Sequence, residues 1–142
     1  MKYRKGYKYQ LAENFGIPVS WHLSPPNGNI ETEFIRLRKE GGVTYLQIRA
    51  AYAWDGPSGP TFDTPTAMTA SLIHDALYQL IREKFIPNED GIARHAADAE
   101  FHHYCIKAGM GRVRRWYMYW ALRRYAAFAA DPTNVKEIIE VP

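Results

Sequence analysis

The sequence predicts an α+β fold in which a small N-terminal antiparallel sheet packs on a C-terminal bundle of three helices. Three observations support this prediction. The N-terminal third alternates apolar and polar residues, a Gly/Pro-rich stretch follows, and three later runs carry apolar residues at helical spacing. The chain has 142 residues, 46% of them hydrophobic, which is enough to bury one ordinary core. We therefore expect a single domain over residues 1–142.

The N-terminal part, residues 1–53, is expected to be rich in strands. Its first aromatic and apolar residues recur with period two: Tyr3, Tyr7, Tyr9 and Leu11. Two further strands are predicted at residues 33–38 and 43–52, where β-branched and aromatic residues are frequent. The intervening Lys39-Glu40-Gly41-Gly42 suits a hairpin turn, so the two strands should pair antiparallel.

Residues 54–64 are expected to form a shaped loop. Their prolines lack N–H donors and their glycines favour φ values that other residues avoid, so no regular element fits. Thr64 followed by Pro65 is a typical helix start, and the first helix should reach about residue 84. Its apolar stripe is Ile73, Leu77, Leu80 and Ile81.

Two more helices complete the segment 65–130. The second is expected after the turn sequence at residues 87–91 and should run to about Ala108, where Gly109 ends it. Its expected buried face is Ala97, Phe101, Tyr104, Cys105 and Ala108. The third should run from Arg112 to about Ala130, and the tail 131–142 either docks as a strand or frays.

The candidate catalytic centre is formed by His74, Tyr78 and Asp98. Tyr78 follows His74 by four residues, so both side chains lie on one side of the first helix. Asp98 borders the buried face of the second helix, and a short connection favours antiparallel packing of the two helices. A histidine oriented by a buried carboxylate can draw a proton from water, because the carboxylate fixes its tautomer and stabilises the imidazolium.

A calcium site is the second expectation. Calcium takes several oxygen ligands, and a carboxylate together with backbone carbonyls from the Gly/Pro-rich loop can provide them. The candidate metal ligands are Asp75, Asp55, Gly56, Ser58 and Gly59. Asp55 and Ser58 can instead brace the loop through local hydrogen bonds to the backbone.

Composition excludes some classes of protein. Cys105 is the only cysteine, so neither an internal disulfide nor a cysteine-based zinc site is possible. No apolar run has the length of a signal peptide or of a membrane span, which takes about 18 residues. We therefore expect the chain in a host cytoplasm or in a virion. A net charge of +3 makes anionic partners only slightly more plausible, and nucleic acid is not expected as a partner.

Three motifs resemble a phage and prophage family of unknown function. They are the loop YAWDGPSGP at residues 52–60, the helix SLIHDALYQ at 71–79 and ADAEF at 97–101. The resemblance covers roughly residues 45–125, and it implies a phage or prophage origin without implying an activity.

A looser resemblance is to secreted and prokaryotic phospholipases A, which share the order of Gly-rich loop, H-D-x-x-Y helix and Asp-bearing helix. This resemblance implies that His74 is the base, Asp75 a calcium ligand, Asp98 the orienting carboxylate and Tyr78 its hydrogen-bonding support. Those enzymes usually have disulfides beside the H-D pair, and this chain has none.

Non-catalytic interpretations remain open for each feature. The H-D and A-D motifs can form a buried polar network in a structural or assembly component of a phage. His95, Asp98 and His102 share a helix side that zinc could use, or they form a solvated face. The arginines and aromatic residues of the third helix can contact a lipid surface, other phage proteins or simply the core.

Overall fold

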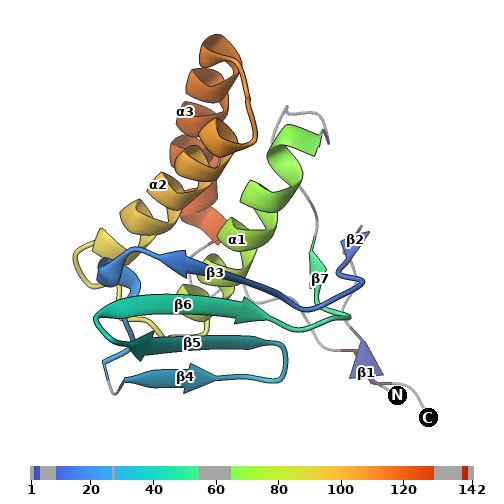
Figure 1. The fold of residues 1–142 in the computed structure, drawn as a ribbon, viewed down its shortest axis with the longest axis vertical. Helices are drawn as coiled ribbons and strands as arrows, with labels where there is room; N and C mark the ends of the chain where they lie inside the picture. Colours follow the sequence, from blue (N-terminus) through green and yellow to red (C-terminus); the bar gives the residue numbers. More distant parts are fainter. Residues whose placement is uncertain (1, 4–8, 27, 55–64, 130–138, 141–142) are drawn as a thin grey trace.

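Antiparallel strands and three helices follow one another along the chain, as the sequence predicts (Figure 1). The computed structural model describes residues 2–3, 9–26, 28–54, 65–129 and 139–140. The strands are β1 (Lys2–Tyr3), β2 (Tyr9–Gln10), β3 (Phe15–Val19), β4 (Asn29–Glu31), β5 (Ile35–Glu40), β6 (Val43–Ile48), β7 (Ala53–Trp54) and β8 (Ile139–Glu140). The helices are α1 (Pro65–Arg82), α2 (Ile92–Lys107) and α3 (Arg112–Ala129), with a short 3₁₀ helix η1 (Trp21–Leu23). The α+β fold class is confirmed.

The main sheet has four antiparallel strands in the order β3-β6-β5-β4. The predicted hairpin is β5–β6, and Glu40 pairs with Val43 at its end. Gly41 and Gly42 form the two-residue turn with φ values of 58° and 79°. Glycine adopts such positive angles without steric cost, and two-residue turns of this kind match the twist of a hairpin.

The strand predicted over residues 43–52 is wrong beyond Ile48, where a turn separates β6 from β7. β6 ends at Ile48, and a turn follows in which Tyr52 N–H bonds to Arg49 O and Ala51 has a φ of 74°. β7 then leaves the main sheet and pairs with β2, placing Tyr9 opposite Trp54. In the described part of the C-terminal tail, β8 pairs with β1, which agrees with the alternative that the tail docks as a strand.

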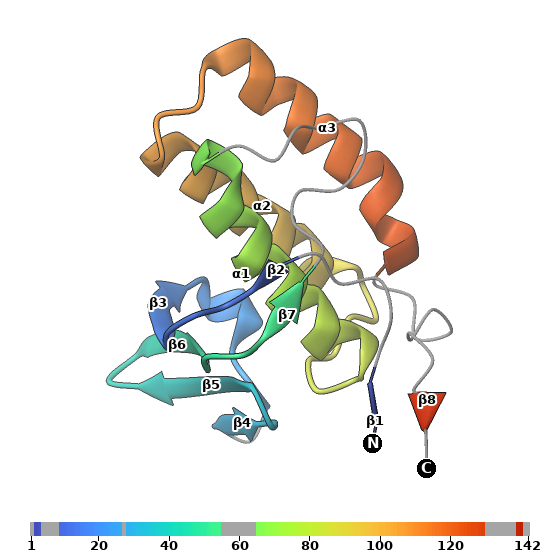
Figure 2. The same ribbon diagram turned by 90° about the vertical axis from the view of Figure 1, so that its right-hand side faces the viewer.

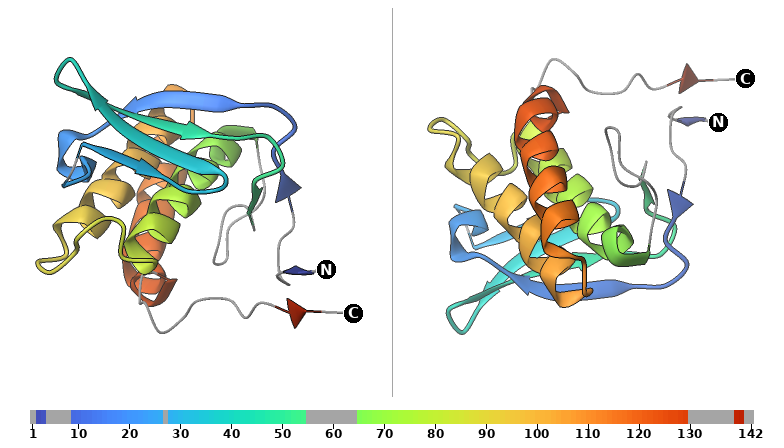
Figure 3. Two further views of the ribbon diagram at one scale, coloured as in Figure 1. Left: turned by 90° about the horizontal axis from the view of Figure 1, so that it is seen from below. Right: turned by 90° about the horizontal axis from the view of Figure 1, so that it is seen from above.

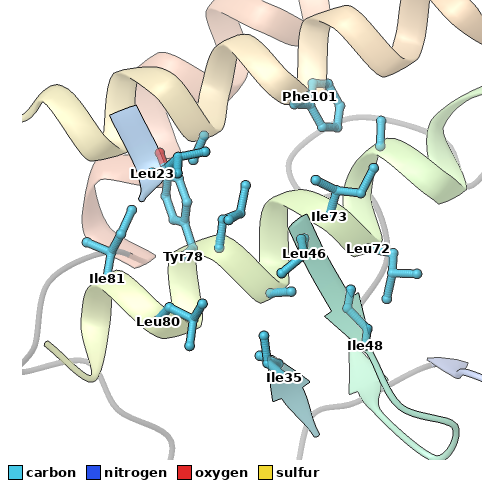
Figure 4. Close-up of a cluster of buried hydrophobic side chains, with 14 of the residues drawn as sticks. Leu23, Ile35, Leu46, Ile48, Leu72, Ile73, Tyr78, Leu80, Ile81 and Phe101 are labelled. Atoms are coloured by element: carbon cyan, nitrogen blue, oxygen red, sulfur yellow. The ribbon is translucent and has the colours of Figure 1, made fainter. Parts of the chain in front are cut away.

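The molecule has three layers. In Figure 3 the sheet lies in front when seen from below and α3 lies in front when seen from above, with α1 and α2 between them. The inner face of the sheet contributes Ile35, Leu46 and Ile48 to a core that α1 completes (Figure 4). The residues of α1 in this cluster are Leu72, Ile73, Tyr78, Leu80 and Ile81. α1 is therefore held between the sheet and α2.

The helix boundaries follow local signals. Pro65 begins α1, and Lys84 in the left-handed region (φ 64°) ends its last turn two residues beyond Arg82. Gly109 (φ 83°) ends α2, and Met110 N–H bonds back to Cys105 O at 3.0 Å. Such a left-handed residue after a helix satisfies carbonyls that the helix leaves open. No helix in these described ranges is long and apolar enough to cross a membrane.

The buried face of α2 differs in part from the prediction. Ala97, Phe101 and Cys105 are buried, whereas Tyr104 is half-buried and Ala108 is exposed. Ala108 is the residue at which the helix ends and the chain turns toward α3, so the prediction of its burial is wrong. Asp98, expected at the edge of this face, is instead fully buried.

Cys105 is expected to be unreactive in the folded protein. The side chain is buried, and burial raises the pKa of its thiol to about 11, so little thiolate exists near neutral pH. With Ellman's reagent at about pH 8, the native protein should show almost no reaction, and one thiol should react after unfolding in urea. Rapid reaction of the native protein would contradict this burial.

Candidate functional site

The three residues predicted to form a catalytic centre meet between α1 and α2. The two helices run in opposite directions side by side, which brings the middle of each into contact (Figure 1). His74 and Tyr78 lie one turn apart on α1, and both face α2. Asp98 lies on α2 within hydrogen-bonding distance of both side chains.

The Asp98 carboxylate joins all three helices. Its Oδ1 accepts hydrogen bonds from His74 Nε2 at 2.9 Å and from the Tyr78 hydroxyl at 2.5 Å. Its Oδ2 accepts one from an Arg123 guanidinium nitrogen on α3 at 2.7 Å. Charge-assisted hydrogen bonds of this length are among the stronger ones in proteins, so the carboxylate is firmly placed.

The centre is deeply buried. Asp98 is 0% exposed, Tyr78 2% and His74 4%. The imidazole lies against the Tyr78 ring, with ring centroids 3.9 Å apart, and meets the edge of Phe101 at 5.7 Å. These contacts fix the plane of the ring, as a base that must point one nitrogen at a substrate requires.

The network determines the tautomer of His74. An ionised carboxylate only accepts hydrogen bonds, so His74 Nε2 must donate to Asp98 Oδ1. In neutral His74 the lone pair is therefore on Nδ1. The Nδ1 atom lies 3.8 Å from Asp75 Oδ1, a distance too long for a direct hydrogen bond.

The pKa values of the pair move in opposite directions. Burial alone would lower the pKa of His74, but the carboxylates of Asp75 and Asp98 outweigh it and raise that pKa. Burial would raise the pKa of Asp98, but hydrogen bonds from His74, Tyr78 and Arg123 lower it. Burial and the Asp98 charge raise the pKa of Tyr78, which stays protonated as a donor. The folded state thus favours a protonated His74 imidazolium beside an ionised Asp98 carboxylate.

Stability should depend on pH through His74. A histidine whose pKa is raised on folding stabilises the protein below its unfolded pKa of about 6.5, and this contribution is lost as pH rises through the folded pKa. The free energy of unfolding should therefore fall across that range in the wild type and fall less in His74→Gln. Urea unfolding at a series of pH values measures this pH dependence of the free energy of unfolding.

The comparison with His74→Gln is the necessary control for this measurement. Burial lowers the pKa of His102, which therefore contributes with the opposite sign, and the variant keeps that contribution. Equal pH slopes in both proteins would contradict the raised pKa of His74.

Arg123 is a site residue that the sequence analysis did not identify. Its side chain is 24% exposed and reaches inward from α3 to Asp98, and the contact raises the pKa of the guanidinium. The only sequence signal was indirect: a carboxylate buried in α2 needs a cation, and α3 carries several arginines. Nothing in the spacing of those arginines singles out Arg123.

The predicted calcium ligands are only partly covered by the structure. Asp75 lies beside the centre with 31% of its side chain exposed. Asp55, Gly56, Ser58 and Gly59 lie outside the described residues. Calcium takes six to eight oxygen ligands, and among the predicted ligands in the described ranges Asp75 alone is present. The described residues do not by themselves fit a calcium ion.

The alternative of a zinc site at His95, Asp98 and His102 is contradicted by the structure. Within the described residues no group of three or more His, Cys, Asp or Glu side chains is arranged to hold a metal ion. Asp98 turns inward to His74 and Arg123, while His95 is exposed. Although the sequence places these three residues on one side of α2, their side chains do not converge on one site.

Of the alternatives for the aromatic residues of α3, a role in the core is contradicted for three of the described ones, whereas Tyr119 is half-buried. Trp116, Tyr117 and Trp120 are exposed, and Met118 is the buried residue of this stretch. Among the described residues, the main contact of α3 is with α2, and α3 lies on the side of the molecule away from the sheet.

Trp54 braces the N-terminal half of α1. Its indole N–H donates to Ser71 Oγ at 3.2 Å, and that hydroxyl donates to Met68 O at 2.8 Å. Ser71 lies one turn before His74. β7 thereby fixes α1 close to the site.

A separate cavity of about 550 Å³ lies on the other side of α2. Its polar lining includes Ser20, His22, His95, Glu100, His103 and Lys107. None of these belongs to the network at Asp98, so this cavity is distinct from the candidate centre.

Comparison with known proteins shows a family without an assigned activity. No curated protein and no solved structure gives a significant match. Residues 32–122 match the model of a family described as "Protein of unknown function (DUF1353)", and this segment includes His74, Tyr78 and Asp98. The match covers 91 of 142 residues, counted from 32 to 122 inclusive. This chain therefore belongs to the DUF1353 family.

Proposed function

We propose that this chain is a phage- or prophage-encoded hydrolase whose His74–Asp98 pair cleaves an ester, with phospholipid esters as the substrate class. The observation that carries the proposal is the hydrogen bond of 2.9 Å between His74 Nε2 and a fully buried carboxylate. Such a bond directs the lone pair of the imidazole to Nδ1, which is the requirement for a general base.

The proposed reaction uses the chain's own groups. Neutral His74 accepts a proton at Nδ1 from a water molecule, and the resulting hydroxide attacks the ester carbonyl carbon. The ester bond breaks, and the imidazolium returns the proton to the leaving alkoxide, so the enzyme is regenerated. Asp98 stabilises the imidazolium, while Tyr78 and Arg123 position Asp98.

The phospholipid substrate class is supported by the arrangement around the base. The phospholipase A resemblance implies a base, an orienting carboxylate on another helix and a tyrosine bonded to that carboxylate. His74, Asp98 and Tyr78 have these mutual contacts. The phage or prophage origin, with a place in the host cytoplasm or the virion, rests on the three motifs alone.

Calcium remains part of the proposal only through Asp75. Its partly exposed carboxylate lies on the Nδ1 side of His74, where a bound cation would polarise a substrate oxygen. The remaining ligands would have to come from Asp55, Gly56, Ser58 and Gly59. A requirement for added calcium would support this part of the proposal.

A structural role is the alternative, and the burial of the network favours it. Both oxygens of Asp98 are occupied, and His74, Tyr78 and Asp98 are each at least 96% buried. Fully satisfied polar networks of this kind fix the packing of helices. In this role the chain is a non-enzymatic structural or assembly component of a phage, which binds other phage proteins.

The test is hydrolysis of phospholipid vesicles and of a water-soluble ester by the purified protein, with and without calcium. Turnover that depends on His74 supports the hydrolase. Turnover that survives His74→Gln unchanged, or no turnover of either substrate, overturns it in favour of the structural role.

A further inference from the structure

One face of α3 carries a continuous stripe of exposed apolar and aromatic side chains. Val113 is 82% exposed, Trp116 63%, Tyr117 45% and Trp120 56%. Their spacing of three, one and three residues places them on one side of the helix. We call these four residues the α3 stripe.

The α3 stripe is not needed to hold α3 on the protein. Met118, on the opposite face, is buried, and Arg123 reaches Asp98. α3 is the outermost helix of the molecule and contacts α2 rather than the sheet (Figure 2). Two exposed indoles one turn apart are costly in water, and such patches usually mark a binding surface.

The charge around the α3 stripe is of one sign. Besides Arg123, which is paired with Asp98, α3 carries four arginines and neither Asp nor Glu: Arg112, Arg114, Arg115 and Arg124. The end of α2 adds Ile106, which is 46% exposed, and the exposed Lys107. The charged residues of α3 and of the last turn of α2 are thus all cationic.

We infer that the α3 stripe docks on an anionic lipid surface. Tryptophan and tyrosine are the side chains that settle at the boundary between headgroups and acyl chains, and arginines beside them bind anionic headgroups. A second copy of the chain is a poorer occupant, because a two-fold contact through this face would bring two cationic helices together. The inference goes beyond the proposed hydrolysis, since it uses no residue of the His74 base.

The experiment is flotation of the full chain with vesicles of phosphatidylglycerol and phosphatidylcholine, and with vesicles of phosphatidylcholine alone. We expect binding to the anionic vesicles that weakens with added salt. The double variant Trp116→Ala/Trp120→Ala should bind at least about tenfold more weakly, because both indoles lose apolar contact with the bilayer.

Trp21→Ala is the matched control. Trp21 is 68% exposed but lies on η1, outside α3, so its loss should leave vesicle binding unchanged. Urea midpoints of both variants should equal that of the wild type, because the altered side chains are exposed. His74→Gln should also bind normally, which separates docking from hydrolysis.

Four outcomes overturn the inference. The first three are a wild type that does not float with anionic vesicles, a double variant that binds as well as the wild type, and a Trp21→Ala variant that loses as much binding as the double variant. A fourth is a dimer in sedimentation velocity that the double variant abolishes, which would assign the α3 stripe to contact between copies.

Discussion

In the proposed hydrolase, replacing His74 with glutamine is expected to lower the rate of phospholipid hydrolysis by about 10²- to 10⁴-fold, the usual contribution of a general base. Glutamine fills a similar volume and can still donate to Asp98, but it cannot accept a proton near neutral pH. Initial rates on vesicles and on a soluble ester measure the effect. His103→Gln removes an exposed histidine of α2 and should leave both rates unchanged.

The pH profile tests the role of Asp98 separately. The proposed base His74 acts only when neutral, and its pKa is raised, so the rate of hydrolysis should increase with pH around a midpoint above the ordinary value of about 6.5. Asp98→Asn removes one of the two carboxylates that raise this pKa, so the midpoint should move to lower pH. An unchanged midpoint would contradict the role of Asp98 in holding the imidazolium.

Replacing Asp98 with alanine should lower the free energy of unfolding by about 3 kcal/mol, because a buried ion pair loses one partner. His74, Tyr78 and Arg123 would all lose their acceptor. We expect a loss at the lower end of the range known for broken buried ion pairs, since the Arg123 side chain is 24% exposed and can turn partly to water. The shift in urea midpoint measures the loss, and Glu89→Ala, at an exposed residue, should be neutral.

A double-mutant cycle with Arg123 sharpens this result. Once Asp98 is alanine, changing Arg123 to alanine removes no further hydrogen bond to the site, so the two losses should be less than additive. Full additivity would contradict the contact between α2 and α3. The hydrolase and the structural role share this prediction, whereas only the hydrolase predicts the loss of turnover in His74→Gln.

The parts of the fold that depend on neighbouring residues could be predicted from the sequence. Pro65 and Gly109 mark the ends of helices through their own backbone preferences, and Gly41-Gly42 allows a tight hairpin turn. The meeting of His74, Tyr78 and Asp98 followed from helical spacing and a short connection between two helices. The helical spacing of His74 and Tyr78 and the antiparallel packing of α1 and α2 were enough to predict this contact.

The parts that depend on distant segments could not be predicted in this way. The pairing of Tyr9 with Trp54 joins strands far apart in sequence, and no local signal encodes that register. The choice of Arg123 among five arginines depends on where α3 crosses α2. The exposure of Trp116 and Trp120 has the same cause, because hydrophobic spacing shows which residues share a face but not what covers it.

The position of Trp54 also makes the protein suited to measurements of tryptophan fluorescence. Of the four tryptophans, Trp21, Trp116 and Trp120 are exposed, while Trp54 is 7% exposed and hydrogen-bonded to Ser71. A buried indole emits at shorter wavelength and is shielded from collisional quenchers such as iodide. Emission that persists under iodide therefore reports on the junction of β7 and α1 alone, one helical turn from the imidazole.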